Sequence, residues 1–359
     1  MMLQPSLWED LPAKSGEITV PPVIAEALHM GAALAVSISG GKDSQAMLLA
    51  LAHLHRQHGW PGPIYAVHAN LGRAEWPQSL SHCERIATTA GVALVTVRRP
   101  QGDLIEEMRQ RMENLRGTGK PPWPDSQNRY CTSDQKRGQI DKVLRAPHWP
   151  SAASRYCTSH QKTNQIDKVL RNPWPTASMR YCTADQKRDQ IVKEHRNHQL
   201  VVAAMGIRAE ESSARAKKQA VSVAVRVTAK TLTGLTPEQA LDAHQEGQRL
   251  ALDWLPLHEW TEDQVFRGFG SSLDDINRRR DLYKSGRAEE ALESFAGHPA
   301  YVFGNQRLSC ALCVLASKGD LLNGIRHCPE IYQEYLAMER ESGFTFRKGM
   351  SLASLGGPS

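Results

Sequence analysis

The sequence predicts an α/β fold built on a doubly wound, mostly parallel sheet. In the first half of the chain, apolar runs alternate with helix-patterned segments, and a glycine-rich turn separates the first run from the helix after it. Strands that read as unbroken apolar runs are typical of parallel sheets, because helices cover both of their faces. The length of 359 residues is enough for a substantial core.

Each element follows from this pattern in chain order. The expected strands are Leu34–Ser39, Pro63–Ala69, Val92–Val97 and Leu200–Met205. The expected helices of this half are Pro22–Met30, Gln45–Gln57, Ser81–Ala90 and Asp103–Met112. From about Trp254 onward strand signals fade and helical patterns dominate, so we expect a nucleotide-binding α/β domain over residues 1–253 and a helical domain over 254–359.

Composition and charge exclude some classes of protein. No apolar run reaches the length of a membrane span, and the opening MMLQPSLWEDLPAK lacks the pattern of a secretory signal, so we expect a cytoplasmic protein with no membrane partner. Seven cysteines in such a chain favour thiolate chemistry or metal ligation over disulfides. The net charge is +6, but Asn128 to Arg196 holds fourteen Lys/Arg against six Asp/Glu.

This basic segment is a threefold repeat of about 26 residues. RYCTSDQK begins at Arg129, RYCTSHQK at Arg155 and RYCTADQK at Arg180, and we expect residues 120–196 to be a helical insertion in the α/β domain. In each unit a Gln follows the Thr by three residues, which is the spacing of a capping box. The cysteine would then lie just outside a helix N-terminus, where a thiolate is favoured.

Two interpretations of the repeat remain open. It is either a tandem duplication with one working copy, or a set in which the extra copies present a basic surface to a polyanion such as nucleic acid. In both, the working cysteine is predicted to be Cys182, in the unit nearest the fourth strand, whereas Cys131 and Cys157 would lie further back.

The turn SGGKDS, Ser39 to Ser44, has the parts of an anion site. It joins a buried strand to a helix, and it combines glycines that let backbone N–H groups approach phosphate, a helix N-terminus and a lysine. The spacing is not that of a Walker A loop.

SGGKDS resembles the PP-loop of the ATP pyrophosphatase superfamily, which has the adenine nucleotide alpha hydrolase-like fold. GIRAEESSAR, Gly206 to Arg215, is similar to a segment of its phosphoadenosine phosphosulfate (PAPS) reductase branch, which includes the DNA phosphorothioation sulfurtransferase. RYCTxxxK, VHANLGRAEW, WLPLHEWTEDQVF and HPAYVFGNQRLSCALC resemble further segments of phage- and plasmid-borne members. One departure is Asn70, where the family commonly has Asp.

The resemblance implies ATP and Mg²⁺ as cofactors. The residues expected to bind the nucleotide are Ser39, Gly40, Gly41, Lys42, Asp43, Ser44, Arg208 and Arg215. Lys42, Arg208 and Cys182 are the expected catalytic residues, and Glu210 and Glu211 are expected ligands of Mg²⁺. For Arg208 the alternative is an ion pair with a neighbouring Glu.

Cys310, Cys313 and Cys328 suggest a metal centre, with Cys182 as a fourth ligand. The resemblance implies a [4Fe–4S] cluster, with zinc or uncoordinated thiols as alternatives. Cys83 lies in a helical pattern and is expected to be a small buried hydrophobic residue.

Three functions follow as hypotheses. The first is an enzyme that activates an acceptor with ATP and transfers sulfur or electrons to it, with nucleic acid as a candidate acceptor and a cysteine desulfurase or thiol reductant as partner. The second is a sulfonucleotide reductase that releases sulfite, and the third is a regulatory or nucleic-acid-binding protein without turnover.

Overall fold

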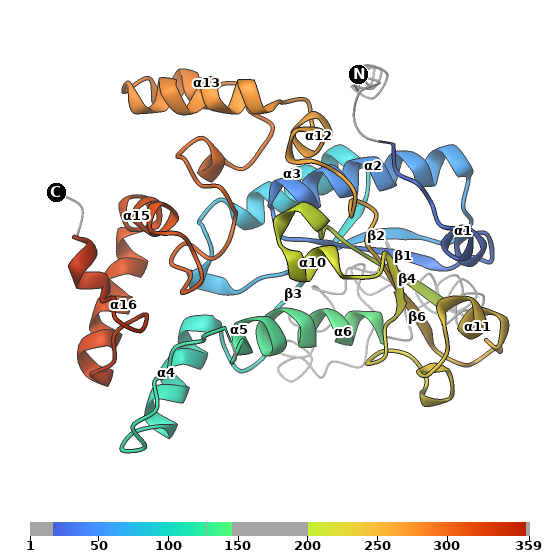
Figure 1. Ribbon diagram of the computed structural model, residues 1–359, viewed down its shortest axis with the longest axis horizontal. Helices are drawn as coiled ribbons and strands as arrows, with labels where there is room; N and C mark the ends of the chain where they lie inside the picture. Colours follow the sequence, from blue (N-terminus) through green and yellow to red (C-terminus); the bar gives the residue numbers. More distant parts are fainter. Residues whose placement is uncertain (1–16, 127, 146–199, 357–359) are drawn as a thin grey trace, which may run out of the picture.

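A computed structural model describes residues 17–126, 128–145 and 200–356 and has one six-stranded sheet at its centre, in the order β3-β2-β1-β4-β6-β5 (Figure 1). The strands are β1 (Ala33–Ile38), β2 (Ile64–Ala69), β3 (Ala93–Val97), β4 (Leu200–Met205), β5 (Val221–Val223) and β6 (Leu250–Trp254). All neighbours pair in parallel except β5, which pairs antiparallel with β6 at the edge. The predicted α/β class with a mostly parallel sheet is therefore confirmed.

The helices follow the strands in the expected alternation. Those before β4 are α1 (Pro22–His29), α2 (Lys42–His58), α3 (Ser79–Ala90), α4 (Leu104–Asn114), α5 (Tyr130–Thr132) and α6 (Gly138–Leu144). Those after it are α10 (Ser213–Ala216), α11 (Pro237–Asp242), α12 (Glu262–Arg267), α13 (Leu273–Lys284), α14 (Ala288–Leu292), α15 (Lys318–His327) and α16 (Pro329–Ser342). The sequence analysis missed β5 and β6, which are short and lie beside the region where strand signals fade.

Alternation along the strands places apolar side chains on both faces of the sheet. Leu34, Val36 and Ile38 of β1 lie in the main core with side chains of α1, α2 and α3. The intervening Ala33 and Ala35 lie in a second core on the other face, against α6. Burial on both faces explains why these strands read as continuous apolar runs.

The C-terminal helices pack on the peptide that carries the first RYCT unit. Trp123 and Tyr130 share one apolar cluster with residues of α15, α16 and the end of the described chain, including Tyr335 and Phe346. Trp123 contacts the Tyr335 and Phe346 rings at 5.7 and 5.4 Å between ring centroids, and its indole N–H donates to the Phe344 carbonyl at 3.3 Å. The first unit is therefore part of the folded core.

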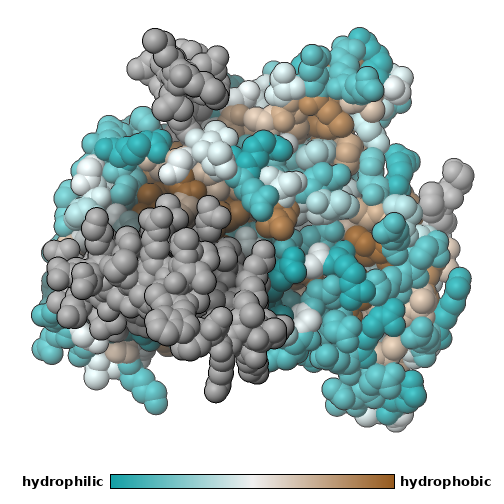
Figure 2. All heavy atoms as spheres, turned by 180° about the vertical axis from the view of Figure 1, so that it is seen from behind, coloured by the Kyte–Doolittle hydropathy of each residue, from teal (hydrophilic) through white to brown (hydrophobic). Residues whose placement is uncertain are grey.

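The surface seen from behind in Figure 2 is mostly hydrophilic where the structure describes it, with hydrophobic residues in small separate patches. None of the helices described is long and apolar enough to cross a membrane.

Candidate functional site

The SGGKDS segment, called the phosphate loop below, leaves the carboxyl end of β1 and runs directly into α2. Gly40 has φ +75°, a left-handed conformation that favours glycine, and Gly41 is the extended residue before the helix. The Ser44 hydroxyl closes the turn, because its Oγ accepts from the Ser39 N–H at 3.2 Å and donates to the Gly41 carbonyl at 2.9 Å. The loop is thus held open at the N-terminus of a 17-residue helix, where anions bind.

A cavity of about 300 Å³ lies over this loop at the carboxyl ends of β1, β2 and β4, and we call it the nucleotide cavity. Its basic lining comes from four separate segments and consists of Lys42, Lys136, Arg215 and Arg307. Tyr301 and Leu308 complete the side formed by the C-terminal half of the chain. Ser39, Gly41, Lys42, Asp43, Ser44 and Arg215, all predicted from the sequence, are among the lining residues.

Arg208, a predicted catalytic residue, does not line this cavity. Its side chain is buried, and its guanidinium pairs with Asp43 at 2.5 Å and with Glu210 at 2.5 Å. Burial acts to lower the pKa of Arg208, but the charges and hydrogen bonds of both carboxylates outweigh it and raise the pKa. The ion-pair alternative therefore describes this geometry, and Arg208 anchors the first turn of α2 through Asp43.

Lys42 lines the cavity, but its ammonium is already paired. Its Nζ lies 3.2 Å from Asp43 and 3.5 Å from Glu262, and the side chain is only 3 % exposed. The charge that Lys42 offers to a ligand is therefore shared with two carboxylates.

Glu210 and Glu211, the predicted Mg²⁺ ligands, are both engaged in ion pairs. Glu211 pairs with Arg215 and, at 3.5 Å, with Arg307, while Glu210 pairs with Arg208 and accepts from the Glu262 backbone N–H at 2.9 Å. Because two arginines share the single carboxylate of Glu211, this wall of the cavity keeps a positive balance.

The first RYCT unit, residues 123–145, supplies Lys136 to the cavity, although we expected this unit to lie away from the working position. The Tyr130 ring lies 3.8 Å below the Arg111 guanidinium, and the fully buried Gln135 donates to Glu107 at 2.8 Å. These contacts attach the unit to α4 and direct Lys136 toward the phosphate loop.

The predicted capping box of this unit is wrong. The helix begins at Tyr130, so Cys131 lies inside its first turn, and Ser133 to Arg137 form a π-helical turn before α6. Gln135 reaches Glu107 instead of the preceding backbone. The pKa of Cys131 is raised, mainly by burial, so the expected helix-stabilised thiolate does not form here.

Cys131 lies beside the Cys310–Cys313 pair rather than apart from it. The charge of Cys313 raises the pKa of Cys131, and the pKa of Cys310 is raised by burial and by Cys313, Glu75 and Cys131, whereas Lys136 lowers both. Sequence reasoning did not assign Lys136, although the RYCTxxxK resemblance contained the signal.

Cys328 is separate from these thiols. It packs in a small cluster with Trp76, Ala300 and Ala311, and burial alone raises its pKa to about 11. The residues present in ranges 17–126, 128–145 and 200–356 include no group of three or more His, Cys, Asp or Glu side chains that could hold a metal ion. The predicted centre also includes Cys182, which lies outside these ranges, so the cluster or zinc centre and the Mg²⁺ role of Glu210 and Glu211 stay predictions.

Cys182 and Cys157 lie outside the described residues. The assignment of Cys182 as the working thiol stays a prediction.

Below the phosphate loop, Cys83 is fully buried, as expected for a small hydrophobic residue. It is not isolated: its Sγ lies 3.6 Å from Nδ1 of the buried His68, whose Nε2 lies 3.4 Å from Glu75. Nδ1 of His68 also lies 3.3 Å from the carbonyl of Ile38, the last residue before the loop. A buried charge pair thus lies between the phosphate loop and the loop after β2.

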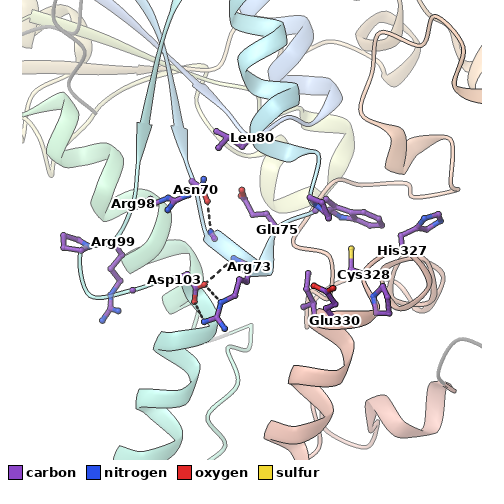
Figure 3. A pocket seen from close by; sticks show the side chains of 17 residues that line it. Asn70, Arg73, Glu75, Leu80, Arg98, Arg99, Asp103, His327, Cys328 and Glu330 are labelled. Atoms are coloured by element: carbon purple, nitrogen blue, oxygen red, sulfur yellow. Dashed lines mark hydrogen bonds and ion pairs between the residues drawn. The ribbon is translucent and has the colours of Figure 1, made fainter. Parts of the chain in front are cut away.

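A second cavity of about 870 Å³, the lateral cavity, is lined by Asn70, the residue after Ala69, which lines the nucleotide cavity. Figure 3 shows Arg98 and Arg99 at the end of β3 on one side, and His327 and Cys328 on the other. The Asn70 side chain accepts from the Gly72 N–H at 2.7 Å and so shapes the loop after β2.

Comparison with known proteins agrees with this geometry. The sequence pattern of the phosphoadenosine phosphosulfate reductase domain matches residues 33–271, which contain the whole sheet and the phosphate loop. No curated protein matches the chain. The chain therefore belongs to the phosphoadenosine phosphosulfate reductase family and carries its nucleotide-binding domain.

Proposed function

We propose that this enzyme binds ATP over the phosphate loop, activates an acceptor by adenylation with release of pyrophosphate, and then delivers sulfur or electrons from its thiols. The observation that supports this proposal most is that one short peptide contacts both the nucleotide cavity and the cysteines. Lys136 faces the nucleotide cavity, and the same short peptide brings Cys131 beside Cys313. A nucleotide site and a set of thiols are thereby adjacent.

The cavity has the charge that a triphosphate needs. The N-terminus of α2 and the side chain of Lys136 offer positive charge, and Arg215 and Arg307 add more than Glu211 neutralises. An acceptor oxygen would attack the α-phosphorus, and these cations would stabilise the departing pyrophosphate.

The thiols would act next. The raised pKa values of Cys131 and Cys310 keep both protonated at neutral pH, and Lys136 is the nearby cation that favours their thiolates. To transfer sulfur, a thiol must first receive a persulfide sulfur from a cysteine desulfurase, which we propose as partner. To transfer electrons, two thiols would form a disulfide, and a thiol reductant would have to reduce it again.

We place the acceptor in the lateral cavity, which is the larger space and has a lining residue next in sequence to one of the nucleotide cavity. Nucleic acid is the proposed acceptor class, because the repeat segment is rich in Lys and Arg.

A second candidate is a sulfonucleotide reductase, which the family match itself favours. In that reaction a cysteine thiolate would attack the sulfate sulfur of PAPS, and the adenosine bisphosphate would leave. A second thiol from the reductant would then attack the S-sulfonated cysteine, release sulfite and leave a disulfide. The intact SGGKDS loop at the N-terminus of α2 favours ATP instead.

Two assays separate these candidates. ATP–pyrophosphate exchange by the anaerobically purified protein supports adenylation, whereas sulfite release from PAPS with a thiol reductant identifies the reductase. Nucleotide binding with neither activity would leave a regulatory protein and refute both enzyme proposals.

Single substitutions test whether the residues of the site are responsible for the activities measured in these assays. Lys136→Gln should reduce ATP affinity about tenfold, because one cation is lost from the cavity. Lys142→Gln is the matched control, since Lys142 lies in the same unit but bonds Gln139 at 3.0 Å outside the cavity. Cys131→Ser should keep pyrophosphate exchange and lose transfer, and full transfer activity in that variant would contradict the role of this thiol.

A further inference from the structure

Tyr301 is the residue that joins the phosphate loop to the C-terminal half of the chain. It ends a short 3₁₀ helix, its side chain is 1 % exposed, and it lines the nucleotide cavity. Its hydroxyl oxygen accepts from the backbone N–H of Lys42 at 2.9 Å, across 259 positions in the chain. The backbone of Leu308 also lies close to this oxygen and acts to lower the pKa of Tyr301.

These contacts leave the hydroxyl proton available. A phenol oxygen accepts through its lone pairs and donates one hydrogen, and here the hydrogen bond comes from a backbone donor, the Lys42 N–H. The Tyr301 O–H meets no acceptor among the residues placed by the structure. The free donor is therefore on a buried side chain at the wall of the cavity.

The surroundings keep this proton on the oxygen. Burial raises the pKa of Tyr301, the charge of Asp43 raises it further, and the backbone groups of Lys42 and Leu308 lower it. The hydroxyl thus stays neutral at physiological pH, while the Lys42 amide draws electron density from its oxygen and makes the O–H a stronger donor.

We propose that the Tyr301 hydroxyl donates a hydrogen bond to a phosphoryl or sulfuryl oxygen of the nucleotide and is a binding residue of this site. The inference rests on the proposed nucleotide-binding function. Leu308, two residues before Cys310, lies against the same part of the loop, since a Cβ built on Gly41 would lie 3.4 Å from the Tyr301 hydroxyl and 3.7 Å from Leu308 Cβ. Tyr301 therefore holds the anionic end of the nucleotide next to the segment that leads to the thiols.

If Tyr301 instead competes with the nucleotide, the expected change in nucleotide affinity has the opposite sign. If the Tyr301 oxygen only occupied the Lys42 N–H, it would compete with phosphate for that amide, and its removal would strengthen binding. The sign of the change in affinity therefore decides between a donor and a competitor.

The experiment measures ATP and PAPS affinities by calorimetry for the wild type, Tyr301→Phe and Tyr283→Phe. Tyr283 is the control, because its hydroxyl contacts His327 at 3.0 Å and does not line the nucleotide cavity. The nucleotide that binds the wild type, ATP or PAPS, should bind the Tyr301→Phe protein about tenfold more weakly, because a hydrogen bond to a charged group is lost. The Tyr283→Phe protein should bind it as tightly as the wild type.

A second variant tests the inference if the Tyr301→Phe protein does not fold. Incorporation of 3-fluorotyrosine at position 301 makes the hydroxyl a stronger donor and a weaker acceptor, so nucleotide binding should tighten. Unchanged or tighter binding by Tyr301→Phe, or weaker binding by the fluorinated protein, overturns the inference. Failure of the wild type to bind either nucleotide would instead refute the proposed function.

Discussion

At the scale of single residues, Gly41 decides whether phosphate can approach the loop. A Cβ there would make ordinary contacts of 3.4 to 3.7 Å with Tyr301, Ser39 and Leu308, but the branches of a larger side chain would enter the nucleotide cavity. We therefore expect Gly41→Val to lower ATP affinity at least a hundredfold by blocking the helix N-terminus. Calorimetry measures the affinity, and circular dichroism checks the fold.

Gly41→Ala is the matched variant for this test. Its φ of −75° suits any residue, so alanine should keep most of the binding. Wild-type affinity in the valine variant would mean that the ligand does not approach this loop.

His68 gives a second prediction at the residue scale, which concerns how the stability of the fold depends on pH. Burial acts to lower its pKa, but hydrogen bonds and charges from Cys83 and Glu75 prevail and raise the pKa from 6.5 to about 10. The folded state thus holds a proton that the unfolded chain releases earlier. The stabilisation is complete below pH 6.5 and is lost as the pH rises through about 10.

Thermal unfolding between pH 6 and 10 measures this effect. The wild type should lose Tm steadily over that range, while Glu75→Gln should start with a lower Tm and change less. Parallel pH profiles for the two proteins would show that the His68–Glu75 pair does not carry the pH dependence.

At the scale of elements, α15 packs against the Cys310–Cys313 loop with no space for an added side chain. A Cβ on Gly324 would lie 1.9 Å from the Ala311 carbonyl oxygen, so the loop would have to move. Overpacking of this kind costs about 1 to 3 kcal/mol. We expect Gly324→Ala to lower the free energy of unfolding by that amount in urea titrations and to increase thiol labelling of Cys310.

Gly319→Ala, in the same helix, is the control. A Cβ there would lie 3.8 Å from Ser317 Oγ, and Gly319 itself is exposed. If both variants are equally stable, the close approach of α15 to the loop does not hold in solution.

At the scale of the whole molecule, the first RYCT unit lines the nucleotide cavity through Lys136, whereas the other two units lie outside the described residues. Residues 146–171 are one further period, with four Lys/Arg and one Asp. We expect a protein lacking residues 146–171 to keep wild-type ATP affinity, because Lys136 remains, and to bind nucleic acid several-fold more weakly with a smaller salt dependence.

Fluorescence anisotropy with single-stranded DNA at several salt concentrations measures the second effect. Loss of ATP binding in the shortened protein would show that the first unit is not sufficient. Unchanged nucleic-acid binding would remove the second unit from the proposed basic surface.

The sequence by itself determined strands β1 to β4 of the sheet and the phosphate loop. Strands β1 to β4 are buried on both faces, so each one reads as an apolar run, and the SGGKDS turn follows from the strand before it and the helix after it. Such local patterns depend on neighbouring residues and are visible without a structure.

Only the tertiary structure decided which distant groups meet. It directed Gln135 to Glu107, buried Arg208 against Asp43, separated Cys328 from Cys310, and brought Tyr301 to the phosphate loop. Residue spacing cannot give these results, because contacts between distant segments are set by how the helices pack on the sheet.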